Sequence, residues 1–262
     1  MLKYKDKFLI TAGGCNHNEI KLWNLENGEC KTTINDKNTF NIYLLIKGKF
    51  NELIVGACST NSDCTCIMVY DIITGKCLCN IGGLIEEKEP NNIIKLKGNL
   101  IASGDGEEIC IWNYKKVKLV KQYNINYKYL IKLNTTQMIC DYKEKLLVFD
   151  YLKYNERYFI HSDNKTYVNY IGKLDHNQLI ISYGDYTIKL FQTNTGHCIK
   201  TFTNILRLVG IHYIKRLSTN TIICCTCNGV QIIDIFNCIL FIDRKLLDTF
   251  YKKCVGYSIK MH

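Results

Sequence analysis

The 262-residue sequence is short of proline and arginine, with one and four respectively, and it lacks the marks of several common protein classes. One proline and 17 glycines exclude a Pro/Gly-rich disordered chain. Residues 1–14 hold only a very short apolar run between charged and small residues, so we expect no signal peptide. The longest apolar stretch, residues 235–242, is far shorter than the roughly 20 residues of a bilayer-spanning helix. We therefore expect a soluble intracellular protein of the cytoplasm, with the nucleus as an alternative.

Motifs of the well-known catalytic classes are also missing. The chain has no G-x-S-x-G, no H-E-x-x-H and no glycine-rich loop that ends in Lys-Ser or Lys-Thr. Gly104-Asp-Gly106 sits between predicted strands instead of opening a helix, so we interpret it as a loop. The carboxylates that could form an acid/base pair fall in predicted exposed loops, where solvation is the simpler explanation: Glu86, Glu87, Glu89, Glu107 and Glu108. We expect no enzyme, no cofactor and no metal.

Cysteine is abundant, with 15 residues, but the odd number and the missing signal peptide favour reduced thiols over a disulfide scaffold. Cys224 and Cys227 are three apart on a predicted strand and face opposite sides, so they cannot share a metal without a bulge. Cys64 and Cys66 would share a face, which leaves a zinc or redox role as a minor alternative. Four others occupy one repeat position, where we expect packing at the start of a strand: Cys30, Cys77, Cys198 and Cys238.

A repeated segment dominates the sequence. Residues 21–30, KLWNLENGEC, return as IMVYDIITGKC at 67–77 and as IKLFQTNTGHC at 188–198. Each copy alternates apolar residues, then places an aromatic residue five positions before a glycine. With three weaker copies included, the repeat is anchored at Trp23, Tyr70, Trp112, Phe149, Phe191 and Ile233. The spacing is near 42 residues, which indicates a repeat architecture.

Each repeat contains four predicted strands. Short apolar runs rich in Ile, Val, Tyr and Thr precede and follow every anchor, and Asn, Asp and Gly bound them. The turn after the anchor has a physical basis, because Asn24 or Asp71 can accept hydrogen bonds from nearby backbone amides. Glycine then supplies a positive φ, at Gly28, Gly75 and Gly196. Val117, Tyr154 and Cys238 replace that glycine in the other repeats, so their turns must be built differently.

Three segments, LITAGG…IKLWNLENGEC, LIASGD…ICIWN and LIISYGDYTIKLFQTNTGHC, make the chain resemble the WD-repeat family. The resemblance implies an all-β fold, a β-propeller of about six four-stranded antiparallel blades. It identifies Asp185 as the family's structural Asp, with Thr187 as the small polar residue after it. The Gly-His pair that usually opens a blade is absent, so we expect sheet packing to hold the fold. The structural repeat residues are then Trp23, Tyr70, Trp112, Phe149, Phe191, Asp71 and Asp185.

We interpret residues 1–262 as one propeller domain. Only about seven residues precede Phe8, so the first repeat is expected to begin at its second strand. Residues 255–261 resemble the first strand at 209–217 and would supply the missing inner strand, closing the ring and removing exposed edges. Six blades fit the spacing, whereas seven would require an unrecognised repeat.

Partner binding is the function that the resemblance implies, on a rigid scaffold or adaptor that helps to assemble a complex. Tyrosines at positions that ring the channel mouth in the family are candidate anchors for a protein or peptide, since Tyr is a favoured interface residue: Tyr43, Tyr127, Tyr142, Tyr167 and Tyr183. His17 lies in the first loop of the same face and is a further candidate, although a plain surface histidine is the simpler explanation. For each tyrosine, packing between blades is an equally good explanation. We expect a monomer within a larger complex.

The formal net charge of +10 supports an alternative, the binding of phosphate-bearing ligands such as phosphoinositides or RNA through a lysine-rich surface. The excess is mostly lysine and is spread over all repeats without a basic loop. Specific phosphate recognition favours clustered basic residues and arginine forks, so nucleic acid is the less favoured partner.

Overall fold

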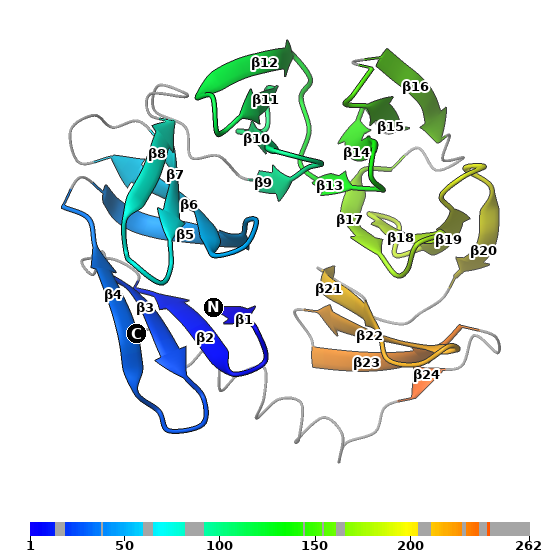
Figure 1. Ribbon diagram of the computed structural model, residues 1–262. Coiled ribbons are helices and arrows are strands. Elements are labelled where there is room, and N and C mark those ends of the chain that lie inside the picture. The colour runs from blue at the N-terminus through cyan, green and yellow to red at the C-terminus, as the bar shows by residue number, and fades with distance from the viewer. Residues whose placement is uncertain are drawn as a thin grey trace. The chain divides into compact units, whose positions relative to one another are not determined.

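A computed structural model of the protein describes residues 1–13, 19–37, 39–59, 65–81, 92–143, 145–153, 155–160, 166–203, 211–226, 229–235 and 240–241. All regular elements in these residues are strands, arranged as six four-stranded antiparallel sheets that follow one another along the chain (Figure 1). No helix within the described part is long and apolar enough to cross a membrane. The prediction of an all-β fold with four strands per repeat is confirmed. The chain divides into two compact units, Met1–Tyr127 and Lys128–His262.

The first unit contains three sheets. Sheet 1 consists of β1 (Leu2–Tyr4), β2 (Phe8–Ala12), β3 (Glu19–Asn24) and β4 (Cys30–Asn35). Sheet 2 consists of β5 (Thr39–Lys47), β6 (Glu52–Ser59), β7 (Thr65–Asp71) and β8 (Cys77–Ile81). Sheet 3 consists of β9 (Asn92–Lys95), β10 (Leu100–Gly104), β11 (Ile109–Asn113) and β12 (Lys118–Tyr123).

The second unit repeats this plan. Sheet 4 consists of β13 (Leu130–Lys132), β14 (Gln137–Tyr142), β15 (Lys145–Asp150) and β16 (Asn155–Ile160). Sheet 5 consists of β17 (Val168–Lys173), β18 (Gln178–Tyr183), β19 (Ile188–Gln192) and β20 (Cys198–Phe202). Sheet 6 consists of β21 (Ile211–Arg216), β22 (Thr221–Thr226), β23 (Gly229–Asp234) and β24 (Leu240–Phe241).

The first repeat has its own first strand, so the prediction that it begins at its second strand is wrong. Leu2–Tyr4 form β1 and pair with β2 in the register Leu2↔Ile10 to Tyr4↔Phe8. Three residues are enough, because Tyr4 is buried and its hydroxyl donates to the Asn51 side chain at 2.6 Å. The edge of β2 that residues 255–261 were expected to fill is thus occupied by β1. Residues 255–261 themselves lie outside the described residues.

A β-bulge marks the anchor of the repeat. In sheets 1 to 5 the register between the third and fourth strands shifts directly before Trp23, Tyr70, Trp112, Phe149 and Phe191. The predicted turn follows, since Asp71 Oδ1 accepts from the amides of Ile73 and Thr74, both at 2.9 Å. Asn24 accepts from the Glu26 amide in the same way. The bulge and the turn together are the local signature that the repeated sequence encodes.

Glycine closes this turn where the sequence provides it. Gly28, Gly75 and Gly196 have φ of 71°, 74° and 73°, which confirms the prediction. Val117 takes the same left-handed conformation, with φ of 48°, although its branched side chain disfavours it. Tyr154 and Cys238 lie outside the described residues.

The core is a series of apolar layers between consecutive sheets of the same unit. One layer joins sheets 1 and 2 around Leu22 and Val55, and another joins sheets 2 and 3 around Ile54 and Ile101. In the second unit, equivalent layers join sheets 4 and 5 and then sheets 5 and 6. Each sheet is therefore a unit of stabilisation that needs a neighbour to cover its face, as in repeat proteins.

Each tryptophan anchor has a hydroxyl partner on the second strand of its sheet. Trp23 Nε1 donates to Thr11 at 2.8 Å, and Trp112 Nε1 donates to Ser103 at 3.1 Å. Both hydroxyls stand two residues after the residue that faces the anchor in the register. In the sheets without tryptophan, the same position carries an apolar side chain or a thiol: Val55, Cys140, Ile181 and Cys224. A polar residue is thus present only where an indole needs an acceptor.

Candidate functional site

Two of the five predicted anchor tyrosines are core residues, which corrects the expectation that they present their rings to a partner. Tyr127 is 7% exposed and Tyr183 is 1% exposed. The reason for Tyr127 is Gly104, because a Cβ at that glycine would lie 1.9 Å from the Tyr127 hydroxyl oxygen. A glycine inside a strand often marks such a close approach, so Gly104 was the signal in the sequence.

Tyr43 and Tyr142 are half-buried, and their role in partner binding stays a prediction. Tyr43 packs against Gly56, where a Cβ would come within 2.7 Å of the ring. His17 lies outside the described residues.

Tyr167 is the predicted tyrosine that is open to solvent, with 66% of its surface exposed. Its ring covers Gly184, since a Cβ there would lie 2.7 Å from ring atoms, and the Gly184 amide donates to the Tyr167 carbonyl at 2.9 Å. Tyr186, in the same β18–β19 turn, is 51% exposed and was not predicted. We call Tyr167 and Tyr186 the tyrosine pair.

Tyr186 lies in the β18–β19 turn, and Tyr167, directly before β17, contacts that turn at Gly184. The turn is held by its own hydrogen bonds. The Tyr183 amide donates to the Thr187 carbonyl at 2.9 Å, and Asp185 Oδ1 accepts from the amide and the hydroxyl of Thr187 at 3.0 and 2.7 Å. Asp185 and Thr187, named from the family resemblance, thus fix the turn locally. Tyr186 adopts φ of 64°, a strained conformation for an aromatic residue that is not compensated by burial.

The opposite ends of the sheets carry a repeated basic residue. In each sheet, one second-strand residue pairs with the anchor on the third strand and also pairs with a residue of the first strand. That first-strand residue is the last of its strand, except in sheet 1, where it is the next to last. In all six sheets this residue is basic: Lys3, Lys47, Lys95, Lys132, Lys173 and Arg216. The lysines that are spread evenly along the sequence therefore include one that recurs at the same structural position in sheets 1 to 5.

Several of these basic side chains contact the preceding sheet of their own unit. Lys173 Nζ donates to the Leu133 carbonyl of sheet 4 at 2.5 Å. Arg216 pairs with Asp175 of sheet 5 at 3.1 Å and donates to the Gln178 side chain. Lys47 Nζ lies 5.7 Å from the centroid of the Tyr4 ring in sheet 1. Long basic side chains thus link neighbouring sheets and keep their charged ends near the surface.

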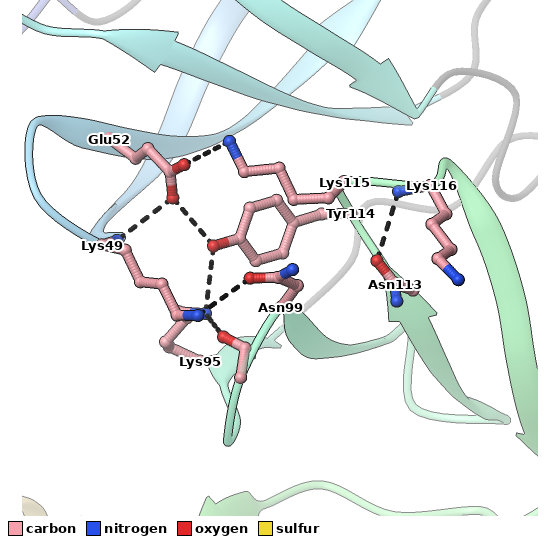
Figure 2. A network of polar contacts seen from close by, with 9 residues as sticks. Lys49, Glu52, Lys95, Asn99, Asn113, Tyr114, Lys115 and Lys116 are labelled. Carbon is pink, nitrogen blue, oxygen red and sulfur yellow. Dashed lines mark hydrogen bonds and ion pairs between the residues drawn. The ribbon is translucent and has the colours of Figure 1, made fainter.

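Figure 2 shows a polar network where sheets 2 and 3 meet. Glu52 is 8% exposed, and its carboxylate accepts from the Tyr114 hydroxyl at 2.8 Å and contacts Lys115 Nζ at 2.5 Å (Figure 2). Burial raises the Glu52 pKa, but the hydrogen bonds from Lys115, Tyr114 and the Lys49 amide outweigh it and lower the pKa below its usual value. Burial and the Glu52 carboxylate raise the pKa of Tyr114. These partners satisfy the buried charge, so we assign the network to stability.

Three repeat-position cysteines begin the fourth strand of their sheets, as predicted, but they are exposed, so the prediction that they pack there is wrong. Cys30, Cys77 and Cys198 face Trp23, Tyr70 and Phe191 across the bulge, and each thiol donates to the carbonyl two residues ahead at 3.5 to 3.6 Å. The bulge turns the first residue of the fourth strand outward. Cys238 lies outside the described residues.

The remaining candidates for chemistry do not converge in the described part of the chain. No group of three His, Cys, Asp or Glu residues there could hold a metal ion. Glu108 accepts hydrogen bonds from the Gln122 and Cys110 side chains, while Glu107 is exposed. Burial raises the pKa of Cys66 to about 11 and that of Cys224 to about 12, so both thiols stay protonated. Cys64, Cys227 and the carboxylates Glu86, Glu87 and Glu89 lie outside the described residues.

No protein-family model and no curated protein matches the sequence. Among solved structures, the chain is similar to the computationally designed Ika8 protein, with a TM-score of 0.64 over 91% of this chain and 71% of the Ika8 chain. The two sequences are 18% identical, so the likeness concerns the fold alone.

Proposed function

We propose that the six sheets are the blades of one β-propeller that resembles the WD-repeat family, and that the protein is a non-catalytic platform. It binds a protein or peptide through the ends of the sheets that carry the β18–β19 turn, and assists the assembly of a complex. The repeated four-stranded sheets support the fold, since all six share one order and five share the bulge at the anchor.

The observation that carries the binding proposal is the tyrosine pair. Tyr167 and Tyr186 are 66% and 51% exposed. Tyr186 lies in a turn that Asp185 and backbone hydrogen bonds fix, and the Tyr167 carbonyl accepts a hydrogen bond from Gly184 of the same turn. Rigid, solvent-exposed tyrosines lose little conformational entropy on binding and give a large contact area with a polar tip. The left-handed backbone of Tyr186 adds a cost that packing does not explain, which is common at binding sites.

The test is affinity capture of the tagged full chain from a native lysate, with mass spectrometry of the retained proteins at low salt and at about 0.3 M salt, where the Debye length falls to several Å. We expect discrete proteins at both salt concentrations with the wild type. The double variant Y167A/Y186A is expected to lose them.

The matched control is F50A, because Phe50 is an aromatic residue that is 89% exposed and also has a positive φ, but lies in the β5–β6 turn of the first unit. It should retain the same proteins as the wild type. Loss of the partner with F50A and retention with Y167A/Y186A would place binding elsewhere and reject the proposed surface. Retention of nucleic acid or lipid alone, released at the higher salt, would reject the platform in favour of phosphate recognition.

A further inference from the structure

A cavity of about 320 Å³ lies in the second unit, between the turn that joins β13 to β14 and the turn that joins β17 to β18. Its lining consists of Lys132, Leu133, Asn134, Thr135, Lys173 and His176. The size falls in the range of small-ligand pockets. It is separate from the tyrosine pair, because the β17–β18 turn follows β17, whereas Tyr167 precedes β17 and Tyr186 lies at the other end of β18.

The lining is strongly cationic. Lys132 and Lys173 occupy the repeated basic position of neighbouring sheets, and His176 adds an imidazole from the second turn. No Asp or Glu is among the residues that line the cavity. The nearest acidic residue in the sequence is Asp175, and its carboxylate forms an ion pair with Arg216 of sheet 6 at 3.1 Å. The Asp175 carboxylate is therefore directed to Arg216 and not to the lysines of the lining.

The backbone around the cavity is held in place. Asn134 Oδ1 accepts from the amides of Thr136 and Gln137, both at 2.9 Å, and so shapes the first turn. The Thr193 hydroxyl donates to the carbonyl of His176 at 3.2 Å and fixes the second turn. Lys173 Nζ donates one of its three protons to the Leu133 carbonyl, so two donors remain for other acceptors. The backbone of both turns and the Lys173 ammonium group are therefore held in place without a ligand.

Two ammonium groups line this cavity, from the half-buried Lys132 and the exposed Lys173, and their like charges repel each other. Burial and, next, the charge of Lys173 lower the pKa of Lys132. An anion between the two lysines would remove this repulsion and accept hydrogen bonds from both, which is the usual way in which lysine binds phosphate as a point charge.

We propose that this cavity binds the phosphate group of a small phosphorylated ligand, with Lys132, Lys173 and His176 as donors. The site goes beyond the proposed platform function and does not depend on it. The ligand chemistry is a phosphomonoester or a diphosphate, and its source is either a free metabolite or the headgroup of a lipid.

Isothermal titration of the full chain with inorganic pyrophosphate tests the site. We expect a dissociation constant below about 1 mM that rises with salt concentration. Replacing Lys132 with Gln should weaken binding by about 10-fold or more, the equivalent of one charge-assisted hydrogen bond. The control K118Q removes the same charge from an exposed residue of β12 and should leave the dissociation constant unchanged.

His176 provides a second variant that does not depend on the half-buried Lys132. Its side chain is exposed, so H176Q should fold normally and still weaken pyrophosphate binding several-fold. Separate titrations with a soluble inositol phosphate and with vesicles that contain a phosphoinositide distinguish a free ligand from a lipid headgroup. The proposal is overturned if the wild type does not bind pyrophosphate at millimolar concentration, or if K132Q and H176Q both bind it as tightly as K118Q.

Discussion

The indole of Trp23 donates a hydrogen bond of 2.8 Å to the Thr11 hydroxyl, which stands two residues beyond the residue that faces Trp23 in the sheet. Trp112 and Ser103 repeat this relationship in sheet 3. The repeat therefore encodes a pair of residues, the anchor and a matching second-strand side chain. From sheet to sheet, a hydroxyl stands on the second strand where the anchor is tryptophan, and an apolar side chain or a thiol stands there where it is not.

We predict that this pair is energetically coupled. T11V should destabilise the protein by about 1 kcal/mol, because it leaves the half-buried indole N–H without an acceptor. The double variant W23F/T11V should lose less free energy of unfolding than the sum of the losses of W23F and T11V, by about 0.5 to 1.5 kcal/mol. Urea unfolding of the single and double variants measures this difference. The same cycle on Trp112 and Ser103 is the internal check, and additivity in both cycles would contradict the coupling.

Val117 should be replaceable with a gain in stability. Its φ of 48° costs a branched residue about 1 to 2 kcal/mol, whereas its side chain is 49% exposed and contributes little packing. Glycine removes this strain but costs about 0.5 to 1 kcal/mol of backbone entropy, so V117G should stabilise the protein by up to about 1.5 kcal/mol. G75V, at the equivalent turn with φ of 74°, should have the opposite sign. A lower urea midpoint for V117G than for the wild type would show that the conformation is not strained.

The Glu52 network should make stability depend on pH below about 4.5. The pKa of Glu52 is lowered in the folded protein, so its ionised form stabilises the fold above the unfolded pKa, and that contribution is lost as the pH falls through the folded pKa. E52Q should be less stable than the wild type by about 1 to 3 kcal/mol at pH 7, and the difference should shrink between pH 4.5 and pH 3. Urea unfolding at several pH values measures it. A difference that does not vary with pH would mean that the carboxylate charge has no role.

Thiol reactivity should follow exposure. Cys30 and Cys198 are exposed at the bulge and should react with iodoacetamide within minutes under native conditions. Cys66, Cys110 and Cys224 are buried, and burial raises the pKa of each, to about 11, about 12 and about 12, so they should react only after unfolding. Peptide mass spectrometry after timed alkylation identifies each site. Fast labelling of Cys224 in the native protein would contradict the packing of sheet 6.

Much of the repeat could be predicted from the sequence, because its signals are local. The anchor at Tyr70, the side-chain turn at Asp71 and the glycine at Gly75 lie within six residues, and all three behave as expected. The brevity of β1 concealed the first strand, since a three-residue strand has almost no periodicity.

The sites were harder to predict because they depend on contacts between segments. Tyr127 and Tyr167 occupy similar places in the sequence, but Gly104 lets one ring enter the core while Gly184 supports the other at the surface. The basic position became visible only through the register, which aligns Lys132 with Lys173 despite different local sequences. The bulge that turns Cys30 outward likewise has no separate signal in the strand pattern.

The measurement that tests the platform most directly is site-specific photocrosslinking in cells. Benzoylphenylalanine would replace Tyr167 or Tyr186 in turn, with Phe50 and Leu217 as control positions in turns between first and second strands, 89% and 43% exposed. The account predicts one discrete protein adduct from both tyrosine positions and none from the controls. Adducts from Phe50 or Leu217 alone, or no adduct at either tyrosine, would contradict it.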